Sequence, residues 1–247
     1  CSGRCFAPPL MLSVSERPMD ADSCYACDQP ATSREHVPPL CIFPEDRDSP
    51  DGVSMRRGIL IRVPSCAAHN AEKSDDDEYF RFVLASNVMA NDAGHGQALT
   101  KVLRSFLRRP AVKERFLHGA KPVRIRESHG TNVHEAEEIP LEFERFNKSL
   151  RLVALGVYRY HYGSRFNGNV ASFADFIDYN PDDMELQTIR VALFDEAARV
   201  FASQPKAGDN PEVFWYQVRE LNKSHTIMRL GFYGLSTATV LFGDLPR

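Results

Sequence analysis

Two pairs of potential metal ligands stand out in the first third of the chain. Cys24 and Cys27 form a CxxC pair, and Cys66 and His69 form a CxxH pair that follows after 38 intervening residues. Thiolate sulfur and imidazole nitrogen are the usual ligands of structural zinc, and this spacing lets each pair hold one side of a tetrahedral ion. The pattern predicts a Cys3His zinc site; the alternative is small buried cysteines and a surface histidine.

The remaining cysteines do not extend this pattern. Cys41 could replace His69 as the fourth ligand, but within residues 38–43 (PPLCIF) we expect a packed apolar side chain. All six cysteines fall at or before position 66, unlike a disulfide framework that staples a whole secreted chain. Together with the lack of a signal-peptide pattern, this distribution predicts a reducing, cytoplasmic location.

A second group of polar residues lies between the two pairs and directly after them. Glu35 and His36 precede a Val-Pro-Pro run, Asn70 follows His69, and Lys73 comes three residues later. With the two ligand pairs, this order resembles the HNH endonuclease family, in the subclass braced by a zinc knuckle. The resemblance covers roughly residues 22–90 and implies a ββα-metal core that hydrolyses phosphodiester bonds in DNA.

The resemblance also implies a role for each matching residue. His36 corresponds to the general base that takes a proton from water, and Glu35 and Asn70 correspond to ligands of a catalytic Mg²⁺ or Mn²⁺ ion. Lys73 would pair with a phosphate. The residues alone leave other readings open: His36 as a structural ligand or turn histidine, and Asn70 as a helix cap.

One departure from the family pattern weakens the catalytic reading. The family's middle Asn orients the base from the strand before the second ligand pair, and here Leu60 and Ile61 occupy that stretch. Another group must therefore orient His36. The competing hypothesis is a noncatalytic zinc module that binds nucleic acid or a protein partner.

The surrounding segments predict the elements that position these residues. Alternation of Ile59, Ile61 and Val63 predicts a strand over 55–63, and the acidic run after Ser74 suits the start of a helix. Apolar residues at Leu99, Val102, Leu103, Phe106 and Leu107 predict an amphipathic helix with a basic outer face.

That basic face is the strongest positive patch of the sequence. Residues 98–126 contain nine Lys or Arg and one Glu, in a chain whose net charge is −3. Phosphate neutralisation by such side chains drives nucleic-acid binding, so we expect Lys101, Arg104, Arg108 and Arg109 to contact DNA; the alternative is a solvated outer face.

The rest of the chain predicts a mixed fold. Periodicity indicates a strand and turn over 123–130, helices over 142–162 and 180–203, a loop over 205–211, and two or three terminal strands within 213–242. We therefore expect an α+β protein with an N-terminal extension (1–19), an HNH module (20–95) and a C-terminal domain (96–247) for substrate or partner recognition.

Composition excludes some classes. No apolar run is long enough for a membrane span, and no phosphate-loop, GxSxG or GxGxxG motif is present. At the family level, such modules occur in phage-defence and mobile-element nucleases, which makes an ATPase or another protein of a defence complex a candidate partner.

Overall fold

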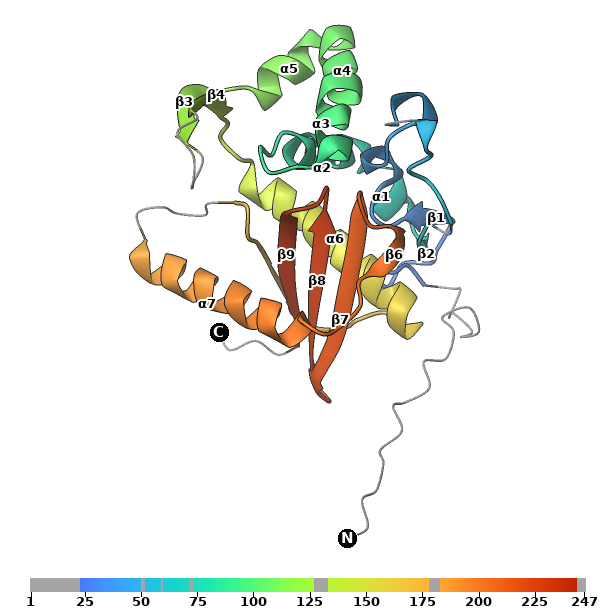
Figure 1. The fold of residues 1–247 in the computed structure, drawn as a ribbon. Helices are drawn as coiled ribbons and strands as arrows, with labels where there is room; N and C mark the ends of the chain where they lie inside the picture. The colour runs from blue at the N-terminus through green and yellow to red at the C-terminus, as the bar shows by residue number, and fades with distance from the viewer. Residues whose placement is uncertain are drawn as a thin grey trace.

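A five-stranded antiparallel sheet forms the centre of the molecule. The computed structural model describes residues 23–49, 52–58, 60–71, 73–126, 133–177 and 183–243. The sheet has the order β5-β9-β8-β7-β6 (Figure 1). Its strands are β5 (Val170–Ala174), β6 (Ala207–Asn210), β7 (Phe214–Asn222), β8 (His225–Phe232) and β9 (Ser236–Phe242). The predicted terminal strands and the α+β class are confirmed.

The prediction of a loop over 205–211 is wrong in its middle. The short edge strand β6 lies there and pairs with β7 through an irregular register between Ala207 and Asn210. Four residues that carry a bulge show no periodicity in sequence, which is why the strand was not predicted.

Two long helices flank the sheet on opposite faces. α6 (Phe143–Tyr162) passes behind the sheet and α7 (Met184–Phe201) lies in front of it (Figure 1). The predicted helix over 142–162 is confirmed, and Gly163 ends it in the left-handed conformation at φ 73°. Of the helix predicted over 180–203, the described part is α7; residues 180–182 lie outside the described residues.

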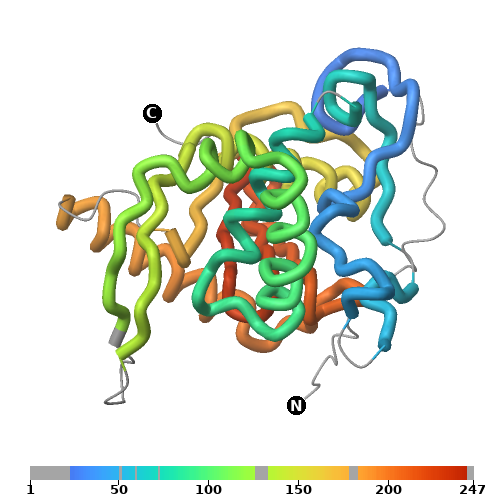
Figure 2. The backbone as a smooth tube through the Cα atoms, turned by 90° about the horizontal axis from the view of Figure 1, so that it is seen from above, coloured from blue at the N-terminus to red at the C-terminus, as the bar shows by residue number. Residues whose placement is uncertain are grey.

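A group of shorter helices lies over one end of the sheet. α2 (Ser74–Ala85), α3 (Asp92–Gln97), α4 (Leu103–Arg108) and α5 (Pro110–Phe116) form this group, and a π-helical turn over Ala98–Val102 joins α3 to α4. The hairpin of β3 (Lys121–Arg126) and β4 (Val133–Glu138) lies on one side of the helices, and the N-terminal segments lie on the other (Figure 2). Of the strand predicted over 123–130, residues 127–130 lie outside the described residues.

The predicted orientation of the basic amphipathic helix is wrong. Leu99, Leu103 and Leu107 are 73%, 47% and 74% exposed, whereas Val102 is buried. The π-helical turn contains one residue more than an α-helical turn and so rotates the residues that follow it about the helix axis. Apolar residues that would share one face at 3.6 residues per turn are therefore divided between two faces.

The N-terminal segments form a small ββα arrangement. β1 (Ser33–His36) pairs antiparallel with β2 (Arg62–Ser65), and the one-turn helix α1 (Ala67–Asn70) follows β2. The strand predicted over 55–63 is confirmed only over 62–63. β2 begins at Arg62 because its partner β1 ends at His36, the residue that pairs with Arg62. Beyond it, a single bond from the Val37 N–H to the Ile61 carbonyl (3.0 Å) continues the pairing. Ile59 lies outside the described residues.

One hydrophobic core joins these parts. The same cluster contains Cys24 and Val63 from the N-terminal segments and Phe80, Phe146 and Phe232 from α2, α6 and β8. The predicted domain boundary after residue 95 falls inside α3. The N-terminal extension lies outside the described residues. None of the described helices combines the length and the apolar character that crossing a bilayer requires.

Candidate functional site

The two predicted ligand pairs come together as a four-donor cluster that could hold a metal ion such as zinc. The three cysteine sulfurs and a His69 ring nitrogen all lie within 4.8 Å of one another. The distance from His69 Nδ1 is 3.6 Å to Cys24 Sγ, 3.5 Å to Cys27 Sγ and 3.3 Å to Cys66 Sγ, and Cys27 Sγ lies 3.7 Å from Cys66 Sγ. Tetrahedral zinc, with bonds of about 2.3 Å to sulfur and about 2.0–2.1 Å to nitrogen, separates its ligand atoms by about 3.6–3.8 Å. The donor set therefore fits zinc in both chemistry and size.

Local backbone bonds bring the two pairs to this position. The Cys24 N–H donates to the Gln29 carbonyl (2.9 Å), which closes the turn that carries the first pair. The Tyr25 N–H donates to the Pro64 carbonyl (2.9 Å), which ties this turn to β2 directly before the second pair. Cys66 lies at the start of α1, and one turn of helix brings His69 back beside it. Cys41 stays outside the cluster: its thiol donates to the Asp77 carbonyl (3.4 Å), and burial raises its pKa to about 11.

Glu35 and Lys73 come together, but as a buried ion pair. Lys73 Nζ lies 3.1 Å from Glu35 Oε1, and it donates to both carboxylate oxygens of Asp77 at 2.7 and 2.9 Å. Glu35 and Lys73 are 7% and 5% exposed. Burial raises the pKa of both carboxyl groups, while the charge of Lys73 opposes this change. Lys73 is therefore held between two carboxylates on the inner side of β1.

Asn70 and His36 lie in different surroundings from this ion pair. The Asn70 amide donates to the Ser33 hydroxyl (2.7 Å), which ties α1 to the start of β1. His36 follows Glu35 in an extended strand, so the two side chains leave opposite faces of β1. Its neighbours on the outer face of the strand pair are Arg62, which is its partner in the register, and Arg34.

The outer face of the strand pair is cationic around a neutral imidazole. Burial lowers the pKa of His36 below its ordinary value of about 6.5, and the charges of Arg62 and Arg56 add to this effect. Arg62 is exposed, whereas Arg56 donates to the Phe43 carbonyl (3.4 Å). At neutral pH this face combines a proton acceptor with fixed positive charges.

The predicted phosphate-binding residues of the basic segment are partly ion-paired. Lys101 Nζ lies 3.6 Å from a Glu45 oxygen, Arg104 forms a two-pronged ion pair with Asp48, and Arg109 pairs with Glu78. Arg108 is exposed and forms no ion pair among the residues that the structure describes. The basic segment thus presents less free charge to a partner than its composition indicates.

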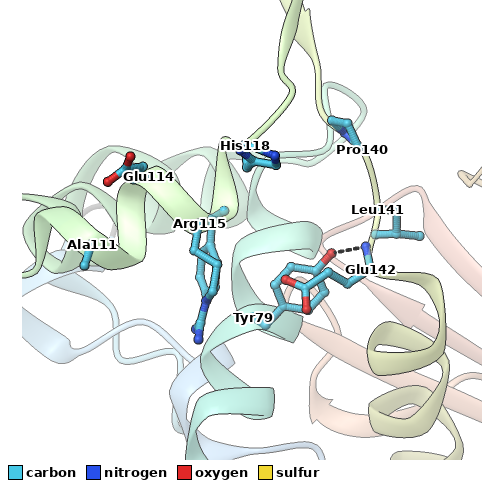
Figure 3. Close-up of a pocket in the computed structure, with 9 residues that line it drawn as sticks. Tyr79, Ala111, Glu114, Arg115, His118, Pro140, Leu141 and Glu142 are labelled. Carbon is cyan, nitrogen blue, oxygen red and sulfur yellow. Dashed lines mark hydrogen bonds between the residues drawn. The ribbon is translucent and has the colours of Figure 1, made fainter.

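One cavity bordered by described residues lies away from these side chains and carries no reactive constellation. It has a volume of about 490 Å³ between α2, α5 and the start of α6 (Figure 3). Tyr79 forms part of its wall, and its hydroxyl accepts a hydrogen bond from the Glu142 N–H (2.7 Å; dashed line in Figure 3). Its charged lining residues, among them Glu114 and Arg115, bring no nucleophile and base together.

Sequence reasoning missed the partners of two candidate residues. Asp77 lies four residues after Lys73 at the start of α2, and this helical spacing could have predicted their ion pair. Arg62 is found beside His36 only when the strand register is known.

No protein family, no curated protein and no solved structure matches this chain in the comparisons.

Proposed function

We propose that the chain is a zinc-stabilised nuclease of the HNH type that hydrolyses phosphodiester bonds in DNA. The observation that carries the proposal is the outer face of the strand pair, where a histidine of lowered pKa lies opposite an exposed arginine. The metal cluster supports the proposal through its position. The turn that carries the first ligand pair is hydrogen-bonded to β2, and β2 pairs with β1, the strand that carries His36.

His36 acts as the general base in this proposal. Its neutral imidazole accepts a proton from a water molecule, whose oxygen then attacks the phosphorus. The P–O bond to the leaving 3′-oxygen breaks, and that oxygen takes a proton from solvent. Arg62 stabilises the negative charge that develops on the phosphoryl oxygens. Arg34 extends the positive surface along β1 toward the neighbouring phosphates.

The family resemblance also implies a catalytic Mg²⁺ or Mn²⁺ ion on Glu35 and Asn70. Glu35 is buried in an ion pair with Lys73, so its carboxylate does not fit an ion unless the lysine moves away. The proposed step at His36 therefore uses no such ion.

A specific observation favours a second candidate, a noncatalytic zinc module that binds nucleic acid or a protein. Lys73, Glu35 and Asp77 form an internal brace between β1 and α2, which is a structural use of residues that the resemblance places in catalysis.

A plasmid-nicking assay decides between the two candidates. Wild type, His36→Ala and His118→Ala are compared in metal-free buffer and with added Mg²⁺ or Mn²⁺; His118 is an exposed histidine at the end of α5. Loss of general-base catalysis costs roughly 10²–10⁴-fold in rate, so we expect His36→Ala to be slower by that factor and His118→Ala to match wild type. Absence of nicking in all three proteins, with or without metal, would leave the noncatalytic module as the function.

A further inference from the structure

A second cavity, of about 340 Å³, gathers positive charge next to the helix group. It lies between α2, the segment from the π-helical turn to α4, and the loop after β1. Six cationic side chains line it: Arg47, Arg81, Lys101, Arg104, Arg108 and Arg109.

Carboxylates only partly balance these cations. Glu45 and Glu78 line the cavity, and Asp48 pairs with Arg104 from its edge. Six cations against three carboxylates leave a surplus of positive charge. A single oxygen of Glu78 accepts hydrogen bonds from Arg81, Arg109 and Ser105, so one carboxylate is shared among several donors.

Two of the cations are desolvated without full compensation. Arg81 is only 6% exposed, and its Nε is buried with no hydrogen-bond partner among the described residues. Burial lowers the pKa of Lys101, and the charge of nearby Arg81 adds to this effect. A buried donor atom without a partner, such as Arg81 Nε, is costly, and the ion pairs of Arg81 and Lys101 leave both cations next to further positive charge that an anion in the cavity would offset.

We propose that this cavity binds a phosphoryl group. Guanidinium groups bind phosphate oxygens through paired, charge-assisted hydrogen bonds, and a phosphoryl dianion matches a surplus of more than one positive charge. Arg108, which is exposed and without an ion-pair partner in the described part of the chain, is the side chain freest to close over it.

The phosphoryl group can come from a free phosphate compound or from a nucleic-acid backbone. Arg56 links the cavity with the His36 face, because its charge lowers the pKa of both Lys101 and His36. The binding site itself does not depend on the proposed nuclease activity.

Isothermal titration calorimetry of the full chain tests the proposal with pyrophosphate and with a short DNA duplex at fixed ionic strength. We expect wild type to bind pyrophosphate and Arg108→Ala to bind it at least about tenfold more weakly, since a charge-assisted bond is lost. Arg199→Ala, which removes an exposed arginine of α7 outside the cavity, is the matched control and should bind as wild type does. Glu45→Gln should bind more tightly, because it removes a competing carboxylate.

Competition then identifies the source of the phosphoryl group. Displacement of the duplex by pyrophosphate supports a backbone phosphate, and pyrophosphate binding without duplex binding supports a free phosphate compound. No pyrophosphate binding by wild type at millimolar concentration, or equal affinity in Arg108→Ala and Arg199→Ala, would overturn the proposal. Pyrophosphate binding that survives in His36→Ala while nicking is absent from every variant would refute the nuclease and retain this site.

Discussion

His36 differs from an ordinary surface histidine because its charged form is disfavoured in the folded state. Burial and the charges of Arg62 and Arg56 lower its pKa. A lowered pKa means that the unfolded chain binds the proton more readily than the folded chain does. The stability that His36 contributes is therefore complete above a pH of about 6.5 and is lost as the pH falls through the pKa of the folded state.

We predict that His36→Gln flattens the acid side of the stability profile. The free energy of unfolding of wild type should fall more steeply than that of the variant as the pH falls below about 6.5. The measurement is chemical denaturation at a series of pH values. The carboxyl groups and the other histidines are present in both proteins, so the difference between the two curves gives the contribution of His36 alone. Parallel curves would show that His36 titrates as it does in the unfolded chain.

The Cys3His cluster makes a second prediction at the scale of single residues. Cys27→Ser removes one thiolate from four donors, whereas Cys41→Ser changes a cysteine that lies outside the cluster. Loss of a structural metal is among the few changes that cost on the order of 4–5 kcal/mol. We expect one zinc per chain in wild type and Cys41→Ser, and little or none in Cys27→Ser.

Mass spectrometry of the native protein and thermal denaturation measure the two effects. The Cys41 variant controls for the general cost of a cysteine-to-serine change at a half-buried site. Full zinc content in Cys27→Ser would mean that the ion has another ligand or that no ion binds here.

At the scale of elements, the sequence predicted what depends on local spacing. Both ligand pairs, α2, α6 and the terminal strands follow from residue spacing and periodicity within one segment. The short strand β6 and the true phase of residues 98–109 could not be read in this way, because a bulge and a π-helical turn break the regular period. The surroundings of His36 and Glu35 depend on strand register and on α2, so residue types alone could not show that Lys73 faces inward.

The contact between α6 and Val37, the residue directly after β1, provides a prediction about packing. Gly156 lies in the buried part of α6, and a Cβ there would come within 2.5 Å of a Val37 methyl carbon, next to His36. Alanine favours a helix by about 1 kcal/mol relative to glycine, but overpacking a core typically costs about 1–3 kcal/mol. We expect Gly156→Ala to be net destabilising in urea denaturation.

Gly96 in α3 is the matched control for this change. A Cβ at Gly96 meets nothing within 4 Å, so Gly96→Ala should gain up to about 1 kcal/mol from helix propensity alone. Adding Val37→Ala to Gly156→Ala should recover part of the loss, because it removes the methyl groups that clash. Similar stability changes at both glycines would contradict close packing of α6 against Val37.

At the scale of the whole molecule, polar contacts bind the N-terminal segments to the sheet. The Tyr233 hydroxyl donates to the Ile42 carbonyl, and the Asn210 amide bonds both the N–H and the carbonyl of Arg57 at 2.9 and 2.8 Å. The hydrophobic core is shared in the same way. If the segments that hold the metal cluster unfold, the end of the sheet that they cover should therefore become exposed, and these segments should not unfold as an independent unit.

We predict that the chain unfolds in one transition whose midpoint depends on zinc. Trp215, the single tryptophan, lies buried in β7 beneath Lys206 and reports on the sheet through its fluorescence. Circular dichroism reports on all helices. Both signals should change at the same temperature, and a zinc chelator should lower both midpoints together by on the order of 10 °C, because the loss of several kcal/mol acts on one cooperative structure. Added zinc should restore them. If the chelator moved only part of the circular dichroism signal and left the Trp215 transition in place, the metal segments would be an independent unit, and a boundary near residue 95 would gain support.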